Sequence, residues 1–118
     1  MSRWLTVLAV FATALSTVGT TGARSDGYTK EQANAAYTDG YLGVAEARCG
    51  FRIPRAIFHA VRERMYPDGI DRSVQALQLA KQEEAFELYH QDPANFCRLM
   101  IAYFGPSGSI SPGFLEPR

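Results

Sequence analysis

The segment Met1–Ala23 has the three-part pattern of a secretory leader, and it sets the environment in which the rest of the chain must fold. A positive charge at Arg3 is followed by an uncharged, mostly apolar run over Trp4–Val18, and small residues occupy positions 21–23. A leader of this kind is removed from the mature protein. The apolar run has about 15 residues, whereas a bilayer-spanning helix needs roughly 20. A retained membrane anchor and an ordinary buried helix are the alternatives.

We therefore expect a signal peptide at residues 1–23 and a single helical domain at residues 24–118. The mature protein would be periplasmic or secreted, with no membrane span after cleavage. The full chain has 12 Lys and Arg against 12 Asp and Glu, and loss of Arg3 with the leader leaves a net charge of −1. That balance offers no general attraction for nucleic acid, so no nucleic-acid partner is expected.

Cys49 and Cys97 are the only two cysteines, and they are 48 positions apart. In an exported chain this even count predicts one structural disulfide. A redox-active pair, which usually has the spacing C-x-x-C, and a metal site are the alternatives. The bridge would close a loop of about 49 residues and stabilise the domain by about 4 kcal/mol in the chain-entropy estimate. Such a staple is valuable because a small domain buries only a modest fraction of its unfolded surface.

Local signals predict the first helix over about residues 30–48. The sequence Thr29-Lys30-Glu31-Gln32 fits a capping box, and Gly50 is a suitable stop. Gly40 and Gly43 lie three apart inside this helix. Each weakens a helix by about 1 kcal/mol relative to Ala, although such glycines also allow another helix to approach closely.

Three further helices are expected. The second has Pro54 at its first position and an apolar stripe reaching Met65. The third covers Ser73–Gln91, with Asp71 or Ser73 as its cap. The fourth begins at Asp92-Pro93 and ends before Gly105-Pro106.

The remaining tail, residues 107–118, is rich in Gly and Pro and is predicted to be extended. Ile110, Phe114 and Leu115 give the tail apolar surface to bury across the helices. No segment shows a strand pattern. The predicted fold is therefore all-α: a small four-helix exported domain stapled by one disulfide, with an extended C-terminal tail.

Two histidine–glutamate pairs are the candidate metal ligands. His59 and Glu63 are four residues apart, and Glu87 and His90 are three apart, so each pair shares one face of a predicted helix. Glu-x-x-His on a helix supplies inward-facing ligands in carboxylate-bridged di-metal bundles. A complete site of that type needs a second such motif and further glutamates. The alternative is two surface pairs, each worth a few tenths of a kcal/mol.

Catalytic motifs are absent from the sequence. It contains no G-x-S-x-G element and no glycine-rich phosphate loop followed by a helix with Lys. We therefore expect a protein that is not an enzyme and that needs no cofactor.

The leading hypothesis is a small secreted or periplasmic non-enzymatic binding or accessory protein, whose partner is another envelope protein. It would present an apolar groove lined by large side chains, with Phe58, Met65, Phe86, Met100 and Phe104 as candidates. In a chaperone-like version, protonation of the acidic cluster over residues 83–92 would loosen the bundle and expose that groove. The alternatives are a metal-binding protein that uses the His/Glu cluster, and a structural subunit of an envelope complex that docks through its tail.

In outline, the cysteine separation, the helical pattern and the leader resemble the small acid-stress chaperones of the bacterial periplasm. The resemblance implies a disulfide-stapled helical protein with a chaperone-like role. The residues around Cys49 and Cys97 match no motif of that family, and the Pro-rich tail differs from its ending. No site residue is therefore carried over from the family.

Overall fold

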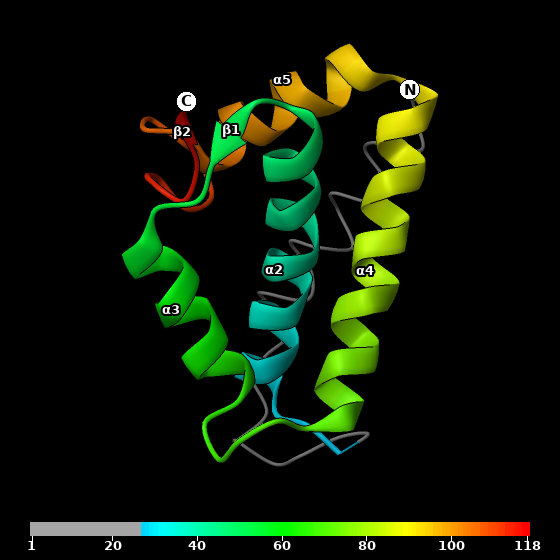
Figure 1. The fold of residues 1–118 in the computed structure, drawn as a ribbon, viewed down its shortest axis with the longest axis vertical. Coiled ribbons are helices and arrows are strands. Elements are labelled where there is room, and N and C mark those ends of the chain that lie inside the picture. Colours follow the sequence, from blue (N-terminus) through cyan, green and yellow to red (C-terminus); the bar gives the residue numbers. More distant parts are fainter. Residues whose placement is uncertain (1–26) are drawn as a thin grey trace.

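The computed structural model describes residues 27–118, and the expected signal peptide at residues 1–23 lies outside them. The described chain contains four helices and one pair of two-residue strands (Figure 1). The elements are α2 (Lys30–Arg48), β1 (Phe51–Arg52), α3 (Arg55–Met65), α4 (Arg72–Gln91), α5 (Pro93–Phe104) and β2 (Glu116–Pro117). The predicted all-α, four-helix fold is confirmed. Within residues 27–118, no helix is long and apolar enough to cross a bilayer.

The two ends of α2 are set by local interactions. Thr29 Oγ1 accepts a hydrogen bond from the Gln32 amide at 3.1 Å, and Gln32 Oε1 accepts one from the Thr29 amide at 2.8 Å. This reciprocal capping box satisfies backbone donors that a helix start leaves unpaired. At the other end Gly50 has φ +74°, a left-handed conformation that glycine adopts readily and that stops the helix. The predicted bounds of 30–48 are confirmed.

Capping carboxylates set the starts of α4 and α5. Asp71 Oδ1 accepts from the amides of Ser73 and Val74 at 2.9 and 3.3 Å, so Asp71 and not Ser73 is the cap of α4. Asp92 Oδ1 accepts from the Asn95 amide at 3.2 Å, and Pro93 occupies the first position of α5 as predicted.

The start of α3 differs from the prediction by one residue. Pro54 is the residue before the helix and has an extended backbone with ψ 142°, so α3 begins at Arg55. Strand β1 ends at Arg52, two residues before Pro54, and the Ile53 amide between them donates to Glu46 Oε2 at 3.0 Å. These contacts hold the chain extended through Pro54.

Helix α2 is the centre of the molecule, with α3 on one side and α4 on the other (Figure 1). A larger core cluster joins α2 to α4, α5 and the tail, and includes the fully buried Tyr41, Phe96 and Phe104. A smaller cluster, which includes Ala36 and Met65, joins α2 to α3 and the start of α4. Burial of these side chains is the main force that holds the helices together.

The two glycines of α2 have different roles. At Gly40 an added Cβ would lie 2.8 Å from the Gln82 amide nitrogen and 3.0 Å from the Gln78 carbonyl oxygen, both backbone atoms of α4. At Gly43 nothing lies within 4 Å of that position. Gly40 therefore lets α2 and α4 approach closely, while Gly43 has no such function.

The tail is packed against the helices and ends in a strand that the sequence pattern did not predict. β2 pairs with β1 in antiparallel register, and an ion pair joins Arg52 and Glu116. Leu115 is fully buried, and its amide donates to the Phe104 carbonyl at 2.7 Å. Arg118 Nε donates to the Phe51 carbonyl at 2.9 Å. β2 is therefore already paired with β1 within the chain, while the docking of the tail on a partner stays a hypothesis.

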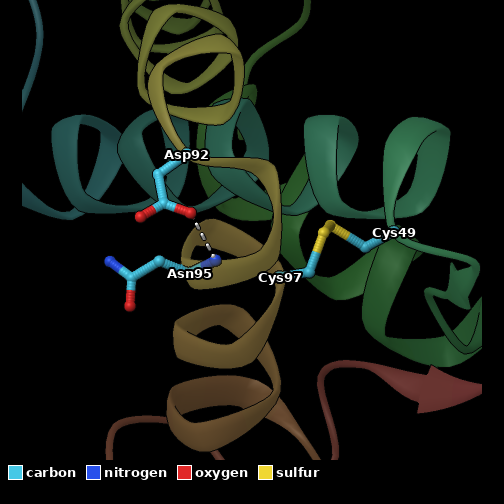
Figure 2. Close-up of a disulfide and its surroundings, with 4 residues drawn as sticks. All are labelled: Cys49, Asp92, Asn95 and Cys97. Carbon is cyan, nitrogen blue, oxygen red and sulfur yellow. Dashed lines mark hydrogen bonds between the residues drawn. A yellow bond between two sulfur atoms is a disulfide. The ribbon is translucent and has the colours of Figure 1, made fainter.

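The disulfide is formed as predicted. Cys49, directly after α2, is bonded to Cys97 in the second turn of α5, with a Cα–Cα distance of 5.5 Å (Figure 2). The link joins the first described helix to the last at the end of the molecule where β1 and β2 also meet.

Candidate ligand-binding cleft

A cleft with a volume of about 530 Å³ lies between α2, α3 and the C-terminal tail. From α2, it is lined by Glu31, Asn34, Ala35 and Thr38. These residues are spaced i, i+3, i+4 and i+7, so they form one continuous stripe on the helix. The volume falls within the range of roughly 300–1,000 Å³ that is typical of small-molecule sites.

Helix α3 and the tail complete the walls. α3 contributes Ile57, Val61 and Arg64 with the same helical spacing, together with Ala60. Phe114 from the tail also lines the cleft, and it is fixed in place because its ring stacks on Phe104 of the core with centroids 6.4 Å apart. The cleft therefore has walls of mixed apolar and polar side chains, built from three separate segments.

One buried hydrogen bond sets the register of α3 against α2. Gln32 Nε2 donates to the Met65 carbonyl at 3.1 Å, while the same side chain caps α2. Figure 1 shows that α2 and α3 run in opposite directions. Their chain neighbours Glu31 and Arg64 therefore flank the same end of the cleft. Both side chains are exposed, and neither forms an ion pair with another described residue.

Asn34 provides the unusual polar atom of the cleft. Its Oδ1 is buried and has no hydrogen-bond partner among the described residues. Leaving a buried acceptor unpaired costs roughly 1–3 kcal/mol. The neighbouring Thr38 hydroxyl does not satisfy it, since that hydroxyl donates to the Asn34 backbone carbonyl at 2.9 Å. The Asn34 side chain lines the cleft, so a ligand could satisfy this acceptor if the amide turned towards it.

Asp39 on α2 and Arg62 on α3 interact electrostatically. Burial raises the pKa of the Asp39 carboxyl, while the nearby Arg62 guanidinium and the Gln78 side chain oppose that rise. Burial also raises the pKa of Tyr66, whose ring lies 5.5 Å from the Arg62 guanidinium carbon. These groups link α2 with both neighbouring helices.

A second polar group lies between α2 and α4. The Tyr41 hydroxyl donates to Glu84, and Lys81 Nζ lies 3.3 Å from the same carboxylate. Burial, and then the Glu84 hydrogen bond and charge, raise the pKa of Tyr41 well above its usual range. Lys81 Nζ also lies 4.6 Å from the centre of the Tyr37 ring. These contacts fix α4 on α2 and do not border the cleft.

The four candidate metal ligands are not brought together. His59 and Glu63 lie on α3, Glu87 and His90 lie on α4, and α2 separates the two helices (Figure 1). All four side chains are exposed. Across residues 27–118, no group of three or more His, Cys, Asp or Glu side chains is placed to hold a metal ion. The predicted cluster therefore does not exist as a site, because its members face outward from opposite sides of the molecule.

The five candidate groove residues do not line one surface either. Met65, Met100 and Phe104 are each about 1% exposed and belong to the core. Phe58 is 40% exposed and lies beside the Arg62 guanidinium, while Phe86 is covered in part by Arg48. In this structure the five residues therefore form no common accessible groove, because Met65, Met100 and Phe104 pack inside the core.

The sequence interpretation missed Asn34, Glu31 and Arg64. One signal was present in the sequence. Asn34 is a poor helix former, yet it lies in a run of alanines inside a helix with a strong cap. The meeting of this stripe with α3 and Phe114 depends on tertiary contacts.

We compared the chain with protein-family models, curated proteins and solved structures, and none of them matches it.

Proposed function

We propose that this protein is a small, secreted or periplasmic, non-enzymatic binding protein that holds a small amphipathic ligand in the cleft between α2 and α3. The observation that carries the proposal is the cleft itself, with partly apolar walls and the unpaired Asn34 Oδ1. Ligand sites commonly combine an apolar lining with a few polar groups that fix orientation.

The proposed location is supported by the leader pattern and the disulfide. Disulfides persist mainly in oxidising compartments, and the Cys49–Cys97 link joins distant parts of the chain. Expression of the full chain in an exporting host tests this point. We expect a purified product that begins after residue 23 and whose cysteines react with an alkylating reagent only after reduction.

The binding function is tested by titrating the isotopically labelled protein with a panel of small amphipathic molecules and following backbone amide shifts. We expect the shifts to concentrate on α2, α3 and the tail around Phe114. Ala60→Trp places a large ring in the cleft and should abolish the response. Ala76→Trp is the matched control, because Ala76 is exposed on α4 outside the cleft. Shifts that spread evenly over the molecule, or that survive Ala60→Trp, would reject the proposal.

A chaperone-like action at low pH is a second candidate, favoured by the structural roles of two carboxylates. Glu84 accepts the Tyr41 hydrogen bond between α2 and α4, and Asp92 caps α5. Loss of charge on both carboxylates would weaken these contacts and loosen the packing that buries Met100 and Phe104. Near-UV circular dichroism and binding of a hydrophobic dye, compared at pH 7 and pH 2.5, provide the test. If neither signal changes, this version is wrong.

A further inference from the structure

We infer that the ligand of the cleft is a free α-amino acid with a large apolar side chain, recognised through both its ammonium and its carboxylate groups. The inference rests on the proposed function, since it names the chemistry of the molecule that the cleft would hold.

The polar end of the cleft carries complementary groups for such a zwitterion. Asn34 Oδ1 is a buried acceptor without a described partner, and the Glu31 carboxylate lies three residues away on the same stripe of α2. Both accept hydrogen bonds, so together they suit an ammonium group with its three donors. Arg64 lies on the facing helix and offers the donors that a carboxylate prefers.

The Gln32–Met65 hydrogen bond explains why the charges of Glu31 and Arg64 lie at the same end of the cleft. It ties the start of α2 to the end of α3, and Glu31 and Arg64 are the chain neighbours of the two bonded residues. The Glu31 and Arg64 side chains form no ion pair with each other or with another described residue. Since no described residue pairs with either charge, both side chains are available to bind a ligand.

The rest of the cleft is suited to the side chain of the ligand. Ile57, Val61 and Phe114 line it away from the charged end, and Val61 is itself 5% exposed. Burying an apolar side chain against these walls would supply most of the binding free energy, while the polar head would fix the orientation.

The same arrangement discriminates against molecules with a single charge. A fatty acid would place its carboxylate near Glu31, and an alkylamine would place its ammonium near Arg64. Either molecule meets a like charge and leaves one group of the cleft without a partner, which lowers affinity. A molecule that carries both charges close together can pair with Glu31 and with Arg64 at the same time.

Isothermal titration with L-phenylalanine and L-leucine tests the inference on the mature, oxidised protein. Each amino acid is compared with its N-acetyl derivative, which lacks the ammonium, and with its amide, which lacks the carboxylate. We expect the free amino acids to bind and each blocked form to bind at least about tenfold more weakly, the effect of losing one charge-assisted hydrogen bond.

Three variants assign the contacts. Asn34→Leu and Glu31→Gln should weaken binding of the free amino acid while leaving the already weak N-acetyl form almost unchanged. Arg64→Gln should also weaken binding of the free amino acid, while leaving the already weak binding of the amide almost unchanged. The matched controls are Glu63→Gln and Arg72→Gln, which remove exposed charges on α3 and α4 outside the cleft and should leave affinity unaltered.

The outcomes separate this inference from the proposed function. If amphipathic probes shift the cleft amides but free and blocked amino acids bind alike or not at all, the inference is overturned and the proposed function stands. If no probe perturbs the cleft, both fail. Binding that is lost only in the blocked forms and in the three cleft variants would establish the inference.

Discussion

The buried side chain of Asn34 is expected to lower the stability of the ligand-free protein. Its Oδ1 is buried without a partner among residues 27–118, between the cleft walls formed by α2 and α3. We expect Asn34→Leu, which has a similar size, to raise the free energy of unfolding by about 1 kcal/mol because it removes an unsatisfied acceptor. Urea denaturation measures this change.

Asn95 is the matched comparison for that substitution. Its Nδ2 is also buried without a described partner, but its Oδ1 accepts a hydrogen bond from Arg98 at 2.5 Å. Asn95→Leu loses this bond and should therefore gain less stability than Asn34→Leu. A loss of stability in Asn34→Leu would show that the Asn34 amide serves the fold and would remove the main support for the cleft as a binding site.

Asp39 is expected to make the stability of the protein depend on pH. Burial raises its pKa in the folded state above the value of about 3.8 in an unfolded chain. The folded state then binds the proton more tightly, so stability falls as pH rises from the unfolded pKa through the folded pKa. We expect Asp39→Asn to raise the free energy of unfolding at pH 7 and to lose that advantage below about pH 3.8.

Denaturation at pH 7 and at pH 3 measures the Asp39 effect. Asp68→Asn, on the exposed turn between α3 and α4, controls for the removal of one carboxylate. If Asp39→Asn is less stable than the parent protein at pH 7, the attraction of Arg62 outweighs the burial of Asp39.

At the scale of the elements, the α2–α4 contact offers a sharp test through the two glycines of α2. Gly40→Ala should lower stability by about 1–3 kcal/mol, because the new methyl group meets backbone atoms of α4 that cannot give way easily. Gly43→Ala should raise stability by about 0.5–1 kcal/mol, since it improves helix propensity in open space. Thermal unfolding of both variants measures the pair. Equal effects at the two positions would contradict the close approach at Gly40.

The helices could be predicted from the sequence because their ends depend on neighbours in the chain. Thr29 and Gln32 cap each other, Asp92 caps the turn that follows it, and Gly50 stops α2 by its own backbone conformation. Each interaction spans about three residues. Where a non-local contact intervened, as at Pro54 beside β1, the prediction was off by one residue.

The strand pair and the cleft could not be predicted for the same physical reason. Strand β2 has two residues and exists because it meets β1, some 64 positions earlier, where Arg52 and Glu116 pair. The cleft requires α2, α3 and Phe114 to come together. Sequence spacing identified the apolar side of each helix correctly, but it could not show whether an apolar side chain such as Met100 is buried or accessible.

At the scale of the whole molecule, the disulfide is expected to decide whether the domain is stable. Small proteins are typically stable by about 5–15 kcal/mol, and the chain-entropy estimate for this bridge is about 4 kcal/mol. The double variant Cys49→Ala, Cys97→Ala should therefore unfold at a much lower urea concentration than the parent protein. In the absence of denaturant, its helices should be intact or only partly formed. Far-ultraviolet circular dichroism during urea titration measures both properties.

The reduced parent protein is the control for that double variant. It lacks the same bridge but keeps both side chains, so it should unfold at nearly the same urea concentration. If removal of the bridge leaves the unfolding midpoint unchanged, the helical core is sufficient by itself.

The bridge also makes the two ends of the molecule mechanically unequal. The Cys49–Cys97 disulfide joins α2 covalently to α5 at one end. At the other end, α3 is held on α2 by side-chain packing and by the Gln32–Met65 hydrogen bond. We therefore expect α3 to open locally more often than the helices joined by the disulfide, so its amides should exchange with deuterium sooner than those near Cys49. Local opening of α3 would let a small molecule reach Asn34 while the rest of the protein stays folded.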